Sequence, residues 1–107
     1  MNKALIVTTE YITGKEVEEM LGAVRGNTIR ARHVGSDIGA GLKSLIGGEI
    51  KGYVKALSSA RDEAMERMIA EAEALGADGI IGVRFATSQV MAGAAEILVY
   101  GTAVKLR

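Results

Sequence analysis

The strongest structural signal in this sequence is a stripe of apolar residues that recurs at helical spacing between residues 49 and 75. Its members are Val54, Leu57, Ala60, Ala64, Met65, Met68, Ala72 and Leu75. Residues at such intervals share one side of an α-helix. Gly76 follows, and glycine suits the left-handed position that ends a helix. We therefore predict one helix over 49–75, about 40 Å long at 1.5 Å per residue and long enough to cross a small sheet.

Two segments with alternating side chains follow this helix. They cover residues 79–87 and 96–104, and residues 91–93 separate them as a loop. Alternation is typical of strands, and two such segments joined by a short loop predict an antiparallel hairpin. In the first segment the alternation places Ile81 and Val83 on the same face.

The part of the chain before the long helix reads as strands and one short helix. We predict strands over residues 4–8, 17–25 and 28–33, with Gly26–Asn27 as either a two-residue hairpin or a bulge in one long bent strand. A short helix is expected over 36–46 because its apolar residues form a single stripe. The predicted class is α+β: a small antiparallel sheet with a long helix and a short helix on one face, in one domain spanning 1–107.

Composition excludes several kinds of site. The 107 residues contain no Cys and a single His, so disulfides, thiolate metal sites, cysteine nucleophiles and three-histidine zinc sites are ruled out. The formal net charge is zero, which argues against non-specific nucleic-acid binding. No apolar run approaches the roughly 20 residues that span a bilayer. We therefore expect a cytoplasmic protein with no nucleic-acid or membrane partner.

The chain has few large side chains for a core. Only four residues are aromatic, and Trp is absent. A core of Ala, Val, Ile, Leu and Met is light for each residue, and burial between subunits would supplement it. The expected partner is therefore another copy of the chain.

Two local features carry weak functional signals. The glycine-rich segment 35–44 resembles a phosphate loop but meets neither the Walker pattern nor the dinucleotide pattern, so a closely packed helix turn is favoured over an anion site. His33 would need carboxylate partners such as Asp37 to bind a metal ion, and a residue at a strand end is the favoured interpretation.

Arg84 and Glu96 fall on the same face of the predicted hairpin, opposite each other or one diagonal apart. We therefore predict a cross-strand ion pair. A structural role in register or between subunits is favoured over a charged cleft. With one His and no G-x-S-x-G nucleophile motif, the interpretation that this is not an enzyme is favoured.

Several short segments, taken together and in order, resemble the YbjQ-like family, whose members are small prokaryotic proteins labelled as heavy-metal-binding. The segments are Thr8-Thr9, Ile12-Thr13-Gly14-Lys15, Gly26-Asn27-Thr28, Gly48-Glu49-Ile50, Ala60-Arg61, Gly76-Ala77-Asp78-Gly79, Val83-Arg84-Phe85 and Tyr100-Gly101-Thr102-Ala103-Val104. The resemblance implies a dodecin-like βαββ fold assembled as a ring-shaped homopentamer. The polar positions that match its pattern are Glu49, Arg61, Arg84 and Glu96, which we interpret first as a subunit-boundary network and second as a ligand or metal site.

The leading functional hypothesis is thus a homo-oligomeric ring that binds a small molecule or an ion between subunits. The alternative is a metal-binding protein whose ligands are carboxylates, such as Glu49 and Asp62, or His33. No cofactor follows from the residues beyond that metal ion. A hydrolase, which would need a buried carboxylate pair, ranks third.

Overall fold

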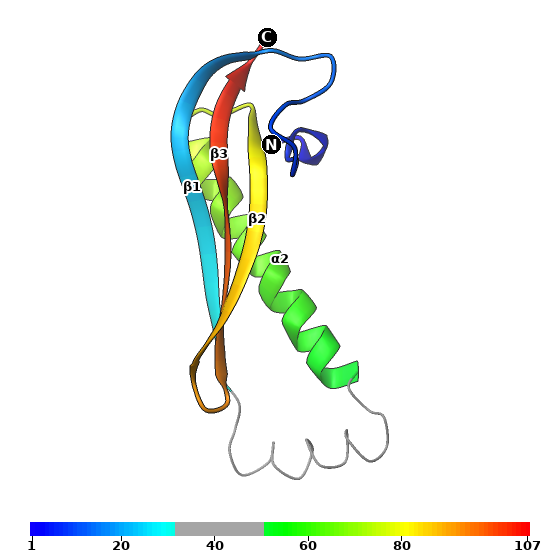
Figure 1. Cartoon of the computed structure of the whole chain (residues 1–107), viewed down its shortest axis with the longest axis vertical. Helices are drawn as coiled ribbons and strands as arrows, with labels where there is room; N and C mark the ends of the chain where they lie inside the picture. The colour runs from blue at the N-terminus through cyan, green and yellow to red at the C-terminus, as the bar shows by residue number, and fades with distance from the viewer. Residues whose placement is uncertain (32–50) are drawn as a thin grey trace.

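The computed structural model of the chain describes residues 1–31 and 51–107, and the side chains of 1–30 and 55–107. Its elements are a short 3-10 helix η1 (Lys3–Leu5), strand β1 (Val17–Ala31), helix α2 (Lys51–Ala74), and strands β2 (Gly79–Met91) and β3 (Ala94–Leu106). The α+β class is therefore confirmed, with the long helix and the hairpin at their predicted places (Figure 1).

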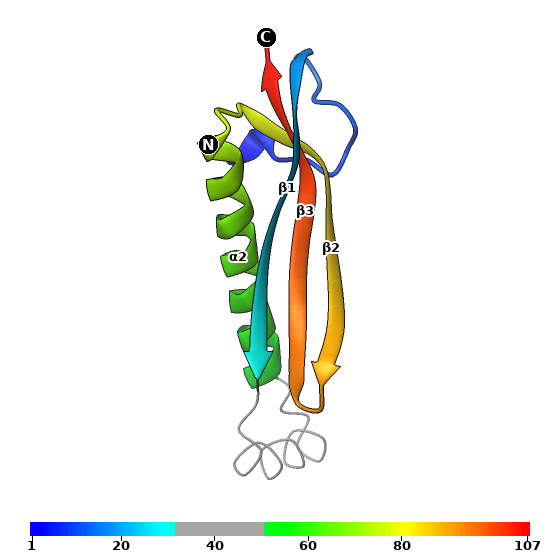
Figure 2. The same cartoon turned by 90° about the vertical axis from the view of Figure 1, so that its left-hand side faces the viewer.

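The three strands form one open antiparallel sheet. Their order is β1-β3-β2, so β3 is central and the two outer strands run in the same direction. Helix α2 lies on one face of this sheet (Figure 2), where it packs mainly against β1 and to a smaller extent against β3. Strand β2 therefore receives little cover from the helix.

The main core lies between α2 and the sheet. It is built from residues with little or no exposed surface: Val24, Ala60, Ala64, Met68, Ala72, Ile80, Val83, Ile97, Val99 and Ala103. Thr28 is buried among them, and its hydroxyl donates to the Ala60 carbonyl over 3.2 Å. The small residues let α2 come very close to β1, and a Cβ built on Gly26 would lie only 2.0 Å from the Ala64 carbonyl oxygen.

The end of α2 follows the predicted glycine cap. Gly76 has a φ of 79°, its amide donates to the Glu73 carbonyl, and the Ala77 amide donates to the Ala72 carbonyl. These two hydrogen bonds satisfy carbonyls that the last helical turn leaves unpaired. Residues 75–78 then connect the helix to β2.

The N-terminal segment differs from its predicted strand over 4–8. Asn2 accepts a hydrogen bond from the Ala4 amide, and this cap begins the 3-10 turn η1 where the strand was expected. Only from Ile6 does the chain lie parallel to the outer edge of β2. There Val7 exchanges backbone hydrogen bonds with Ile80 and Val83, and Thr9 accepts one from Gly82. A second, smaller cluster of Ile12, Ile81 and Val104 covers this end of the sheet on the face away from α2.

Residues 17–31 form a single strand, so the hairpin alternative at Gly26–Asn27 is wrong. Pairing with β3 continues without interruption through both residues, and the irregularities of β1 fall earlier, between Val17 and Glu19 and between Met20 and Gly22. Gly26 is needed here for the close approach of the helix rather than for a turn.

A bulge at Gly82 interrupts the alternation predicted for β2. Ile81 pairs with Thr102 and Arg84 pairs with Tyr100, so two residues of β2 stand opposite the single Gly101. Gly82 takes a φ of 62°, a backbone conformation that favours glycine. Ile81 and Val83 consequently lie on opposite faces, contrary to the alternation. The predicted helix over 36–46, the glycine-rich segment 35–44 and His33 lie outside the described residues.

Candidate functional site

The four candidate residues do not form one site among the residues that the structure describes. Glu49 lies outside them, and Arg61 lies on an exposed part of α2. Arg84 and Glu96 lie on the same face of the sheet, as predicted, and this is the face away from α2, but they do not meet. Arg84 stands opposite Tyr100, and Glu96 stands opposite Ser88.

The predicted ion pair is wrong because the hairpin turns later than expected. Strand β2 runs to Met91 and β3 begins at Ala94, so the strands are longer and their pairing is displaced. Four residues along β3 separate Tyr100 from Glu96, about 14 Å at 3.4 Å per residue. Arg84 instead donates through Nη1 to the Thr8 carbonyl (2.7 Å) and the Val83 carbonyl (2.9 Å), and Glu96 accepts from the side-chain Nδ2 of Asn27 over 3.2 Å.

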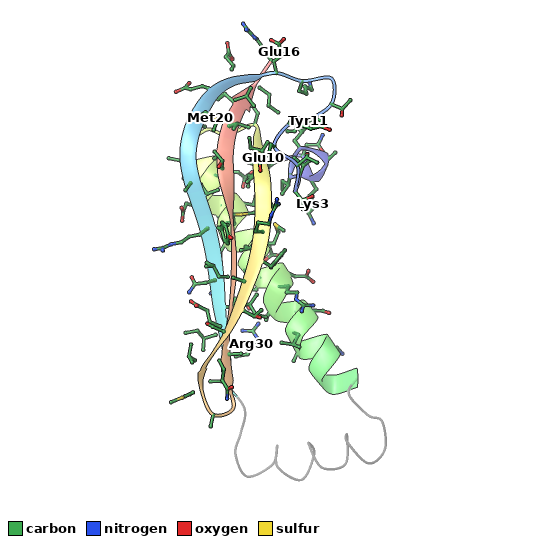
Figure 3. All side chains as sticks on the ribbon, in the orientation of Figure 1. Lys3, Glu10, Tyr11, Glu16, Met20 and Arg30 are labelled. Carbon is green, nitrogen blue, oxygen red and sulfur yellow. The ribbon has the colours of Figure 1, made fainter. Side chains whose placement is uncertain are left out.

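A network of ion pairs ties α2 to β1; the sequence predicts its i,i+4 pair of Glu63 and Arg67, but not the part of Arg30. Glu63 receives Arg30 at 2.5 Å on one carboxylate oxygen and Arg67 at 2.6 Å on the other. Arg67 also donates to the Asn27 carbonyl of β1 over 2.6 Å. The hydrogen bond from Arg30 and the two positive charges hold the pKa of Glu63 below its ordinary value. The i,i+4 spacing of Glu63 and Arg67 indicates the pair within the helix, but only the fold brings Arg30, which Figure 3 labels, to Glu63.

The face of the sheet away from α2, here called the open face, carries side chains from all three strands. Cross-strand partners share a face, so Arg25, Tyr100 and Arg84 form one row across the sheet, and Asn27, Leu98 and Ala86 form the next. Tyr100 is 44% exposed and Ile29, further along β1, is 59% exposed. The row of Arg25, Tyr100 and Arg84 has one arginine on each side of the tyrosine, and none of the ion pairs among the described residues includes either arginine.

The far part of β2, residues 84–91 and here called the distal arm, is exposed along its whole length. Phe85 projects on the side of the sheet that carries α2 yet is 46% exposed, and Val90 and Met91 are 51% and 65% exposed. Residues 85–95 include no charged side chain. Beyond Arg84, the distal arm is therefore an uncharged, partly apolar strand without cover from the helix.

The molecule exposes more surface than a compact domain of its mass. The accessible surface is 7090 Å², whereas a folded monomer of 11.2 kDa has about 5,700 Å². The radius of gyration is 17.2 Å, against about 13 Å for a compact chain of this length. The excess is consistent with a fold that has one helical layer on part of an open sheet.

Comparison with known proteins shows which family the chain belongs to. The model of the YbjQ family, described as "Putative heavy-metal-binding", matches residues 4–107. The chain belongs to this family. A UPF0145 protein of Archaeoglobus fulgidus is 60% identical over 108 residues and covers both chains completely. A UPF0145 protein of Halorubrum lacusprofundi is 65% identical over 99 residues, which are 92% of this chain and 95% of the relative.

A solved structure shares the fold of this YbjQ-family chain. It is a Pediococcus pentosaceus protein of unknown function from the DUF74 family, with a TM-score of 0.66 and 20% identity over 95% of this chain and 96% of the other. At that identity the likeness concerns the fold alone. No helix among the described residues is long and apolar enough to cross a membrane.

The described residues do not fit the heavy metal that the family description implies. Soft metal ions prefer thiolate and thioether ligands, and the chain has no Cys. Among residues 1–31 and 51–107, no three His, Cys, Asp or Glu side chains gather in a group that could hold a metal ion. Met68 is completely buried in the core. His33 and Glu49, which the sequence analysis considered as ligands, lie outside these ranges.

Proposed function

We propose that this YbjQ-family chain is an assembly and binding module that works as a homo-oligomeric ring, in the pentameric form that the family resemblance implies, rather than as an enzyme. The observation that carries the proposal is the surplus of exposed surface. The folded chain has 7090 Å² of accessible surface, about 1,400 Å² more than a compact monomer of its mass.

This surplus matches what assembly would bury. A standard interface takes about 800 Å² from each partner, and a subunit in a ring contributes to two interfaces. Apolar side chains stand on the surfaces available for this purpose, including Ile29, Phe85 and Val90. Burial of that area would complete a core that has few aromatic residues.

The test is the mass of the full-length chain in solution, measured by native mass spectrometry and by light scattering over a range of concentrations. We expect a single multiple of 11.2 kDa, and about 56 kDa for five copies. A folded monomer that persists at high concentration would overturn the proposal. The expected partner is the chain itself, and the proposed compartment is the cytoplasm, which cell fractionation would test.

The ligand-binding part of the proposal points to a small anion. In the row of Arg25, Tyr100 and Arg84, two arginines are the cross-strand neighbours of a tyrosine whose hydroxyl can donate a hydrogen bond. Guanidinium groups bind phosphate and carboxylate oxygens well. Two backbone carbonyls already hold Arg84, so this side chain loses less freedom when it binds.

Thermal unfolding with inorganic phosphate and with citrate tests this part. We expect the anions to raise the melting temperature of the wild-type chain, and the rise to be lost in Arg25→Gln and Arg84→Gln. Arg107→Gln is the matched control because Arg107 lies at the end of the chain, paired with Glu16. An equal response in all four proteins would remove the row from the proposal.

A further inference from the structure

The two outer strands of the sheet differ in how their edges are protected. An outer strand presents unpaired backbone groups that can accept another strand, and proteins guard such edges with bulges, charges or cover. Strand β1 has two irregularities near Glu19 and Met20, acidic residues at Glu18 and Glu19, and a carbonyl at Asn27 that already accepts from Arg67. Its edge is therefore poorly suited to pairing along much of its length.

The edge of β2 is protected over its first part only. The segment from Ile6 to Thr9 pairs with β2 between Ile80 and Val83. Beyond Arg84, the described residues provide neither a pairing strand nor a charge until Glu96, and an irregularity of the strand falls near its far end, between Gln89 and Met91. The distal arm is eight residues long, about 27 Å at 3.4 Å per residue, and every residue in it is exposed.

From this contrast we propose that the distal arm of β2 is the surface through which one copy of the chain binds the next, with its free edge and the Phe85 side buried against the neighbouring subunit. This inference rests on the oligomer proposed above and adds the surface that makes it. A second copy is the occupant because the arm beyond Arg84 carries no charge and is partly apolar, and the surplus surface of the chain is close to what two standard interfaces take.

A ring places further demands on the contact. Ring closure requires two unlike surfaces to meet, so the arm of one subunit meets a different part of the next. The outer strands run in the same direction, and rotation about a ring axis parallel to the strands preserves that direction. One edge in each copy that the described residues leave without cover is thus sufficient to continue the assembly around the ring without an edge-to-edge stack of like arms.

The primary experiment places one charge on the arm. Thr87 is exposed on the arm, and Thr13 is exposed in the turn before β1, so Thr87→Lys and Thr13→Lys are matched variants of the full chain. A lysine buried at an interface loses its hydration, and we expect Thr87→Lys to raise the concentration at which the oligomer dissociates by about tenfold or more. Thr13→Lys should leave this concentration unchanged. Circular dichroism verifies that both variants fold.

A second measurement does not depend on weakening the oligomer. The chain has no Trp, so Phe85→Trp provides a single reporter on the arm, and Tyr11→Trp provides one on a side chain that is 66% exposed. On dilution through the dissociation range, the emission of Phe85→Trp should move to longer wavelength while that of Tyr11→Trp stays constant.

The outcomes separate the inference from the proposed function. If the wild-type chain is a monomer, the proposed oligomer itself is wrong. If the wild-type chain is oligomeric but Thr87→Lys dissociates as the wild type does, or Phe85→Trp emits as a solvated side chain throughout, then the oligomer stands and the distal arm is not its interface.

Discussion

The close approach of α2 to β1 makes Gly26→Ala a decisive test of the core. The new methyl group would lie 2.0 Å from the Ala64 carbonyl oxygen and 2.5 Å from the Met68 amide nitrogen. Carbon atoms of this kind do not come closer than about 3.0 Å to such atoms. Both obstacles are backbone, so no side-chain rotation relieves them, and the helix must move away from β1 by about 1 Å.

The energetic consequence follows from the packing of that interface. A gap of about 1 Å forfeits up to roughly half of each dispersion contact along it, and overpacking by one methyl already costs about 1–3 kcal/mol where side chains can adjust. We therefore expect a loss of at least about 3 kcal/mol in the free energy of unfolding. For a chain of this size that corresponds to a fall in melting temperature of about 12–24 °C.

Denaturant and thermal unfolding at one fixed protein concentration would measure this effect, because assembly makes the melting temperature depend on concentration. The control is Ala23→Ser, which adds one heavy atom to an exposed position of the same strand and should change stability by less than about 0.5 kcal/mol. Glycine in a strand interior is otherwise about 0.5–1 kcal/mol less favourable than alanine. A Gly26→Ala variant that is as stable as the wild type, or more stable, would refute the contact.

Three further predictions concern the core, the ion network and the helix end. Met68→Ala should lower the free energy of unfolding by about 2–5 kcal/mol because Met68 is fully buried. The control Met20→Ala, at a position that is 61% exposed, should lower it by less than about 0.5 kcal/mol. Denaturant midpoints of the two variants measure this difference. The folded-state pKa of Glu63 is lowered from its ordinary value of 4.5. The stabilisation from the Glu63 carboxylate is therefore complete above pH 4.5 and is lost as the pH falls through the folded-state pKa. Glu63→Gln should flatten this part of the curve of stability against pH, and an unchanged curve would contradict the network. Gly76→Ala should cost about 1–2 kcal/mol because φ there is 79°, and a neutral result in thermal melts would show that the cap has another geometry.

The helix and the hairpin were predictable because their signals are local. The stripe containing Ala60, Ala64 and Met68 specifies which side of α2 is buried, and Gly76 specifies where the helix ends. Each signal depends on neighbours within about one or two turns. The loop at 91–93 was predictable for the same reason, although its turn occupies only the last two of those residues.

Register was not predictable, and the candidate site depends on it. The pairing of Arg84 with Tyr100 rather than with Glu96 follows from the position of the turn together with the irregularity between Gln89 and Met91. An offset of one residue moves a strand side chain to the other face, and an offset of a few residues separates two charges by many ångströms. No pattern within β2 alone indicates that Ile81 and Val83 face opposite ways.

The amino-acid order of this YbjQ-family chain was sufficient to establish its class, its long capped helix, its final hairpin and its lack of thiolate chemistry, since these depend on residue identity and on neighbours a few positions away. The folded structure alone decided that Gly26 admits the helix backbone, that Arg30 joins Glu63, and that β2 extends beyond the cover of α2. Those features depend on how separate segments are placed against one another, and that placement is set by the packing of the whole core.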